Sequence, residues 1–260
     1  MNPPGHVLVT GAAGAIGGAL ARAMRAAWPA AKLALLDRDA HAMTGLASEL
    51  GLATTHGLDL RALGALPDLV AELDTVAPLD GLVNCAGIMR VQQLGSWKWE
   101  DAQDLIAIDL LAPLRLQELI ARRMLERTPD TSGVIINVAS MAGKVPLKGC
   151  TYYGASKAGL AMASEIARAE LAPHGIRVVT VYPGPVRSPL ETGARAAWGG
   201  GGLFGKVAPL GEPAELARRI MVAIVRDEPR VIYPRLYSVG WSATNLSSWI
   251  ALSYGPPAPS

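Results

Sequence analysis

The 260-residue sequence is poor in cysteine, in dense basic runs and in long apolar runs. Its two cysteines, Cys85 and Cys150, form no metal-binding or redox pattern, so we expect a reduced, cytoplasmic protein without a metal site. No apolar run reaches the length of a membrane span, and we expect no signal peptide before the first predicted strand. The net charge of +2 without a basic cluster argues against nucleic acid as a partner.

What the sequence does contain is an alternation of apolar strand-like runs and helical patterns, with no internal repeat or linker. Half of the residues are hydrophobic, which is enough for a sizeable core. Such alternation predicts a single α/β domain over 1–260, a Rossmann-type doubly wound parallel sheet of about seven strands with helices on both faces. The predicted strands cover 6–10, 32–36, 52–56, 81–84, 134–139, 176–182 and 230–233. The predicted helices cover 19–28, 40–50, 61–76, 97–127 with a break near Pro113, 152–171 and 212–226.

A glycine turn follows the first predicted strand and opens the first predicted helix. Gly11, Gly14 and Gly17 lie in it. Glycines let the backbone approach a pyrophosphate, and the start of a helix offers free N–H groups and a positive dipole end. We therefore predict a dinucleotide phosphate site, with a tight packing turn as the alternative.

An acid ends the second predicted strand. Asp37 lies about 20 residues after the glycine turn, where a carboxylate binds the adenosine ribose hydroxyls and repels a 2′-phosphate. Asp37 thus favours NAD over NADP, although a plain helix-capping or turn role is the alternative. Arg38 follows at once and would meet a phosphate, which keeps NADP open.

Three further residues are spaced for proton chemistry. Tyr153 and Lys157 lie four residues apart and share one face of a predicted helix, while Ser140 directly follows a predicted buried strand. An ammonium beside a phenol favours the phenolate, so Lys157 would lower the pKa of Tyr153 toward working pH. Taken alone, this spacing is also common on ordinary amphipathic helices.

Together these motifs resemble the short-chain dehydrogenase/reductase family over 7–226. Thr10-Gly11 and Ile16-Gly17 are similar to its T-G-x-x-x-G-I-G cofactor fingerprint, and Pro183-Gly184 to its nicotinamide-side motif. The resemblance implies an NAD-linked enzyme that acts on CH–OH groups, with Ser140, Tyr153 and Lys157 as its catalytic residues. The cofactor-binding residues that it implies are Gly11, Gly14, Ile16, Gly17, Asp37, Arg38, Asp59, Leu60, Asn84, Ala86, Gly87, Tyr153, Lys157, Pro183, Gly184, Val186 and Ser188.

One position departs from the pattern that the family is known for. Its fourth catalytic residue is an Asn on the long central helix, credited with holding a water in a proton relay behind the lysine. Asp109 stands there in this chain. A carboxylate would hold the same water, but its charge would also pair with Lys157 and alter the pKa of Tyr153.

The substrate end of the site is less defined. We predict an apolar pocket that includes Ser140, Met141, Leu147, Tyr153, Pro185 and Leu190, with 189–210 as a glycine-rich lid and 236–260 as an atypical tail. The resemblance also implies a homodimer or homotetramer. The predicted function is interconversion of an apolar secondary alcohol and its ketone with NAD. The alternatives are an NADPH-linked carbonyl reductase and a non-catalytic NAD(H)-sensing regulatory protein.

Overall fold

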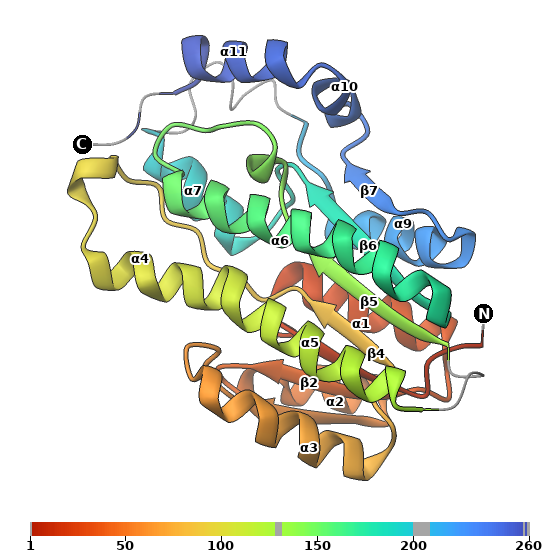
Figure 1. Ribbon diagram of the computed structural model, residues 1–260. Helices are drawn as coiled ribbons and strands as arrows, with labels where there is room; N and C mark the ends of the chain where they lie inside the picture. Colours follow the sequence, from red (N-terminus) through yellow and green to blue (C-terminus); the bar gives the residue numbers. More distant parts are fainter. Residues whose placement is uncertain (1, 128–131, 200–208, 257, 259–260) are drawn as a thin grey trace.

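A seven-stranded parallel sheet forms the centre of the computed structural model, which describes residues 2–127, 132–199, 209–256 and 258 (Figure 1). The strand order is β3-β2-β1-β4-β5-β6-β7, which confirms the doubly wound α/β fold. Every pairing is parallel, so the carboxyl ends of the strands share one edge. The strands are β1 (His6–Thr10), β2 (Lys32–Asp37), β3 (Ala53–Gly57), β4 (Gly81–Asn84), β5 (Gly133–Val138), β6 (Ile176–Pro183) and β7 (Arg230–Tyr233).

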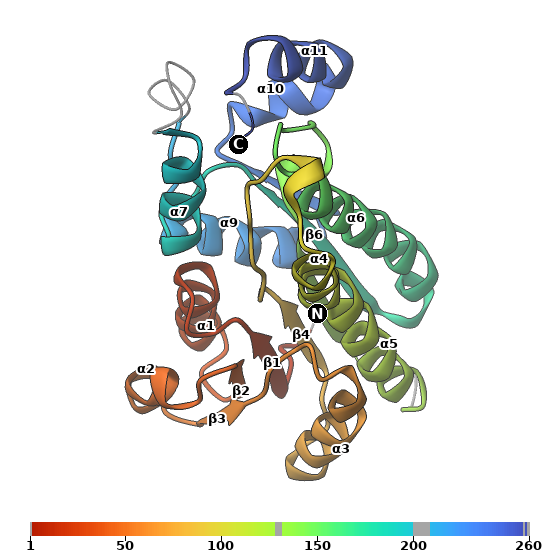
Figure 2. The same ribbon diagram turned by 90° about the vertical axis from the view of Figure 1, so that its left-hand side faces the viewer.

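Helices cover both faces of this sheet (Figure 2). One core lies under α1 (Ala15–Ala27), α2 (Thr44–Leu50) and α9 (Pro213–Arg226). The other lies under α3 (Leu66–Val76), α5 (Ala112–Leu125) and α6 (Thr151–Leu171). The central strands read as unbroken apolar runs because both of their faces are buried.

The predicted break of the helix near Pro113 is wrong, because the helix continues through this region. The chain stays helical from α4 (Trp99–Ile106) into α5 and widens into a π-helical turn, Ala107–Leu111, between them. Pro113 lies in the first turn of α5, where its missing N–H costs little, and the wider turn precedes it. This turn carries Asp109, and it leaves that side chain fully buried.

Three helices lie at the carboxyl edge of the sheet that the sequence patterns did not predict: α7 (Pro189–Ala197), α10 (Tyr237–Ser242) and α11 (Thr244–Tyr254) (Figure 1). The first part of the predicted lid loop is thus a helix. Ser188 caps it by accepting a hydrogen bond from the Glu191 N–H at 3.1 Å, and Pro189 fits its first position. The remainder, 200–208, lies outside the described residues.

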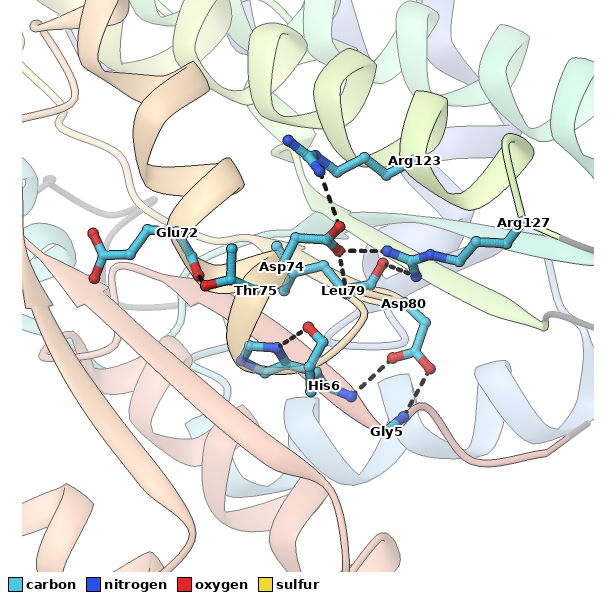
Figure 3. A network of polar contacts seen from close by, with 10 residues as sticks. Gly5, His6, Glu72, Asp74, Thr75, Leu79, Asp80, Arg123 and Arg127 are labelled. Carbon is cyan, nitrogen blue, oxygen red and sulfur yellow. Dashed lines mark hydrogen bonds and ion pairs between the residues drawn. The ribbon is translucent and has the colours of Figure 1, made fainter.

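A polar network closes the opposite, amino edge of the sheet (Figure 3). Asp80 accepts hydrogen bonds from the N–H groups of Gly5 and His6, both at 2.9 Å. Asp74 accepts from Leu79 N–H and forms ion pairs with Arg123 and Arg127 of the α5 region. These contacts fasten β1, α3 and α5 at the edge away from the site described below. No helix in the described part of the chain is long and apolar enough to cross a membrane.

Candidate active site

A large cleft runs along the carboxyl edge of the sheet. Its volume is about 1280 Å³, and it extends from the glycine turn after β1, past the ends of β2, β4 and β5, to α7, α10 and α11. Single small-molecule pockets usually measure roughly 300–1,000 Å³. The cleft therefore has room for a large ligand together with a smaller one. Within the described residues, no group of three or more His, Cys, Asp or Glu side chains is placed to hold a metal ion.

The cleft brings together nearly all of the residues that the sequence singled out. Of the predicted catalytic, cofactor and substrate residues, only Asn84 and Asp109 do not line it. Asn84 points inward from the end of β4 and donates to the Asn137 Oδ1 at 2.9 Å and to the Pro113 carbonyl at 3.1 Å. Asn84 thus supports the cleft wall from within, which differs from the direct contact expected for it.

Ser140, Tyr153 and Lys157 meet at the centre of the cleft. The Ser140 Oγ accepts a hydrogen bond from the Ala142 N–H at 3.1 Å, and the Ser140 side chain lowers the pKa of Tyr153. The Lys157 Nζ lies 5.9 Å from the centroid of the Tyr153 ring and donates to the Val138 carbonyl at 3.4 Å. All three are buried, so solvent screens their mutual interactions weakly.

A glycine allows this close meeting of β5 and α6. After Ser140 the chain makes a 3₁₀ turn, Met141–Gly143, that packs directly on the backbone of α6. A Cβ atom added at Gly143 would lie 2.7 Å from both the Lys157 carbonyl carbon and the Ala158 nitrogen. Only glycine fits between the two elements that carry the three side chains.

Asp109 lies directly behind Lys157. Its Oδ2 is 3.3 Å from the Lys157 Nζ, in an ion pair that lacks the alignment of a good hydrogen bond. Its Oδ1 accepts a hydrogen bond from the Ile88 N–H at 2.8 Å. A Cβ atom on Gly87 would lie 3.2 Å from the Lys157 Nζ and 3.3 Å from the Asp109 Oδ2, so glycine makes room for the pair.

The electrostatics of this group differ from the sequence-based expectation in one respect. Burial raises the pKa of Tyr153; the Lys157 charge and the Ser140 hydrogen bond lower it, while Asp109 raises it further. The pKa of Tyr153 is therefore above its ordinary value, although Lys157 acts in the predicted direction. Burial lowers the pKa of Lys157, but the Asp109 carboxylate, Tyr153 and Cys85 together outweigh this, so the pKa of Lys157 is raised. Burial also raises the pKa of Asp109, against the pull of Lys157.

The glycine turn packs tightly and also lines the cleft. Gly11 has φ +66°, and a Cβ atom there would lie 2.7 Å from the Ala86 Cα. At Gly17 a Cβ atom would lie 2.2 Å from the Gly11 carbonyl oxygen, so α1 starts tightly against the turn. Gly11, Gly14 and Gly17 border the cleft at the start of α1 and form a cradle there. Free N–H groups at a helix N-terminus are of the kind that bind a pyrophosphate.

The acid after β2 borders the same cradle. Asp37 accepts hydrogen bonds from the N–H groups of Ala13 at 3.2 Å and Arg38 at 2.8 Å. Its carboxylate therefore steadies the turn as well as lining the cleft. Farther out, Asp59 is held by Arg61, which also pairs with Asp104. Hydrogen bonding from Arg61 lowers the pKa of Asp59.

Comparison with known proteins agrees with this geometry. The family model of short chain dehydrogenases matches residues 5–198. The chain belongs to the short-chain dehydrogenase family.

Its similarity to individual members spans most of the chain. It is 33% identical over 222 residues to the D-threitol dehydrogenase of Mycolicibacterium smegmatis, covering 81% of this chain and 82% of that one. It is 31% identical over 237 residues to the ketoacyl reductase HetN of a Nostoc species, covering 87% and 77%. A short-chain dehydrogenase of Sphingobium yanoikuyae, solved in complex with NADPH, has a TM-score of 0.77 at 28% identity, covering 96% and 95%.

As a short-chain dehydrogenase, the protein is an NAD(P)-dependent oxidoreductase that acts on CH–OH groups. Several positions depart from the family pattern. Besides Asp109, Ala15 stands where the T-G-x-x-x-G-I-G fingerprint has its middle glycine; the glycines here are at 11, 14 and 17.

Sequence reasoning about this short-chain dehydrogenase missed the residues that close the substrate end of the cleft. Trp198 of the α7 end, Tyr237 of α10 and Ile250 of α11 all line it. A Cβ atom on Gly184 would lie 2.8 Å from the Tyr237 ring, so α10 packs directly on the turn after β6. The sequence signal for Tyr237 and Ile250 was the uncharged, Trp-containing tail. Its contacts with the rest of the fold are visible only in three dimensions.

Proposed function

We propose that this short-chain dehydrogenase interconverts an apolar secondary alcohol and its ketone and prefers NAD to NADP. The observation that carries the proposal is the meeting of Ser140, Tyr153 and Lys157 in the cleft that also contains the glycine cradle. Bound nicotinamide would supply or accept the hydride. The protein would then have to handle only the proton and the charge on the substrate oxygen.

In this mechanism Tyr153 exchanges the proton with the substrate oxygen. For oxidation, the phenolate takes the proton of the alcohol hydroxyl while the hydride leaves the carbon that carries this hydroxyl. For reduction, the phenol returns a proton to the carbonyl oxygen. Ser140 donates a hydrogen bond to the oxygen, where charge develops. Lys157 stabilises the phenolate by its charge, the effect that lowers the pKa of Tyr153.

The proposed binding of NAD uses the other lining residues. The pyrophosphate would lie over Gly11, Gly14, Ile16 and Gly17, and the adenosine ribose beside Asp37. The carboxylate of Asp37 would accept hydrogen bonds from ribose hydroxyls and repel a 2′-phosphate. The remaining cofactor contacts are proposed for Arg38, Asp59, Leu60, Ala86, Gly87, Pro183, Gly184, Val186 and Ser188, all of which line the cleft.

The proposed apolar substrate follows from the lining beyond Ser140. Met141, Leu147, Pro185 and Leu190 border this end, together with Trp198 and Ile250. Burial of an alkyl or ring group there would supply binding energy in proportion to the apolar area removed from water.

The decisive experiment is a fluorescence titration with NADH and NADPH, followed by a panel of alcohols and ketones with the cofactor that binds more tightly. We expect tighter binding of NADH and turnover of apolar secondary alcohols. Tyr153→Phe should abolish turnover and leave NADH binding nearly unchanged, because only the phenol oxygen is lost. Substantial activity in that variant would refute the mechanism. Tight binding without turnover on the whole panel would favour an NAD(H)-sensing protein instead.

The NADPH-linked carbonyl reductase is the second candidate, because Arg38 lines the cleft next to Asp37. Two similar solved proteins, at 28% and 29% identity, were obtained with NADPH and NADP. Asp37→Ala distinguishes the candidates. If Asp37 repels the 2′-phosphate, the variant should gain NADPH affinity about tenfold or more; an unchanged preference would show that Arg38 already selects NADP.

A homodimer through the two long helices is the proposed assembly. Met162 and Ile166 of α6 are 65% and 50% exposed, and Leu111 before α5 is 43% exposed. Sedimentation of Met162→Ser/Ile166→Ser against the unaltered protein tests this interface. The lid role of 189–210 likewise stays a prediction.

A further inference from the structure

The C-terminal tail contains no side chain that is charged at neutral pH. From 236 to 260 the sequence has no Asp, Glu, Lys, Arg or His. Its two helices, α10 and α11, lie beyond the carboxyl edge of the sheet in both views, with α11 outermost (Figures 1 and 2). An outermost helix without charge is unusual, because surface helices normally carry a polar face.

The two sides of α11 meet different surroundings. Ser247, Ile250 and Ala251 line the cleft. Leu246, Trp249 and Leu252 do not line it, and they are 57%, 56% and 48% exposed. A spacing of three residues places these last side chains along one stripe of the helix. One side of α11 therefore closes the cleft, and the other presents large apolar side chains outward.

Neighbouring side chains extend the stripe. Leu236 and Val239 at the start of α10 line the cleft, but they are also 67% and 65% exposed, so they lie at its rim. The exposed ring of Tyr254 meets Trp249 edge-on at 5.5 Å between centroids. Contiguous exposed apolar surface of this kind marks an interaction site. Trp and Tyr are the aromatic residues enriched where a lipid bilayer meets water.

Basic side chains border this surface. Exposed Lys144 has its Nζ 4.8 Å from the Trp241 ring centroid, and exposed Arg235 lies two residues before the start of α10. Two acids near α10 are paired: Glu165 binds Arg230 and Tyr182, and Glu191 pairs with Arg195. A basic rim suits an anionic surface. It disfavours a second copy of the chain, because a two-fold contact would bring the same basic rims together.

We propose that the outward face of α11, formed by Leu246, Trp249, Leu252 and Tyr254, docks on an anionic lipid bilayer together with Leu236 and Val239 at the rim of the cleft. The apolar stripe enters the boundary between headgroups and acyl chains, and Lys144 and Arg235 meet the headgroups. Because the opposite side of α11 lines the cleft, docking places an apolar cleft wall next to the lipid. An apolar substrate dissolved in the bilayer then reaches the cleft without crossing water.

Flotation of the full-length protein with phosphatidylcholine vesicles, with and without phosphatidylserine, tests the proposal. We expect binding to the vesicles that contain phosphatidylserine. Leu246→Ser/Trp249→Ser/Leu252→Ser should weaken it at least about tenfold through the lost apolar contact. The control Leu52→Ser/Val76→Ser/Val225→Ser removes three apolar side chains elsewhere that are at least as exposed, and it should leave binding unchanged.

A second variant leaves the stripe intact. Lys144→Gln/Arg235→Gln should weaken binding to phosphatidylserine vesicles, by about fivefold for each charge removed, and leave binding to phosphatidylcholine alone unchanged. NADH binding in solution reports that each variant is folded. Failure of the protein to float, or equal flotation of the stripe variant, would overturn the proposal. The proposal would also be overturned if the only change in the stripe variant were a smaller oligomer in sedimentation. The face would then be a contact between copies of the chain.

Discussion

A single carboxylate sets the charge balance of the proposed catalytic group. Asp109 is fully buried, 3.3 Å from the Lys157 ammonium, and Lys157 in turn faces the ring of Tyr153. An Asn at this position would accept the same Ile88 N–H hydrogen bond without bringing a negative charge. The charge of Asp109 keeps Lys157 protonated but cancels part of its effect on the phenol, so it raises the pKa of Tyr153.

The first prediction concerns this carboxylate. Asp109→Asn should move the ascending limb of the pH profile for alcohol oxidation toward lower pH, because removal of the negative charge lowers the pKa of Tyr153. More phenolate is then present near neutral pH, so activity there is kept or raised. The profile of kcat/KM against pH measures the shift.

The matched control is Asp101→Asn, which removes an acid on α4 that pairs with Arg90. Asp101→Asn should leave the ascending limb of the pH profile at the same pH as in the unaltered protein. A large loss of activity in Asp109→Asn, without a shift of the limb, would show that the carboxylate has a role of its own beyond its charge on Lys157.

At the scale of elements, the site depends on how closely β5 and α6 approach each other. Ser140 belongs to the turn after β5, whereas Tyr153 and Lys157 belong to α6, so their distance is fixed by the packing of two separate segments. Gly143 is the contact point, with no room for a Cβ atom against the α6 backbone. Its neighbours are main-chain atoms of a helix, which cannot move aside as a flexible side chain would.

The second prediction follows from this packing. Gly143→Ala should push the turn away from α6 and lower turnover by roughly a hundredfold, the scale of a misplacement of about 1 Å. Overpacking should also cost about 1–3 kcal/mol of stability. Initial rates and thermal unfolding measure both effects. In the control Gly45→Ala, the added Cβ atom on α2 would have no neighbour within 4 Å. This change should stabilise the protein slightly and leave turnover unchanged. Equal rates for the two variants would contradict the packing argument.

The sequence predicts features that depend on neighbouring residues, but it does not predict contacts between segments that are far apart in the chain. All seven strands were predicted to within about two residues, because apolar runs such as Val7-Leu8-Val9 report burial on both faces directly. The glycine turn and Tyr153 with Lys157 are local patterns as well. By contrast, the inward direction of Asn84 depends on Asn137 from another strand, and the contact of Tyr237 with Gly184 joins distant segments. No local pattern encodes such contacts.

At the scale of the whole molecule, the amino and carboxyl edges of the sheet have different roles. The amino edge is fastened by the ion pairs of Asp74 and the backbone contacts of Asp80 (Figure 3). The carboxyl edge opens into the cleft, as expected for parallel sheets, which bind ligands where their strands end. A ligand in the cleft would therefore connect turns that follow β1, β2, β4, β5 and β6, and its binding energy would add to the stability of the entire sheet.

The third prediction uses this connection. NADH at a hundredfold excess over its dissociation constant should add about 2.7 kcal/mol to the free energy of unfolding. For a chain of this size, that corresponds to a rise in Tm of roughly 5–10 °C. Scanning calorimetry with equal concentrations of NADH and NADPH measures the rise, which should be smaller for NADPH because Asp37 repels the 2′-phosphate. Tyr153→Phe should keep the full rise, since it removes only the proton donor. If neither dinucleotide raises Tm, the cleft does not bind them and the cradle after β1 is only a packing turn.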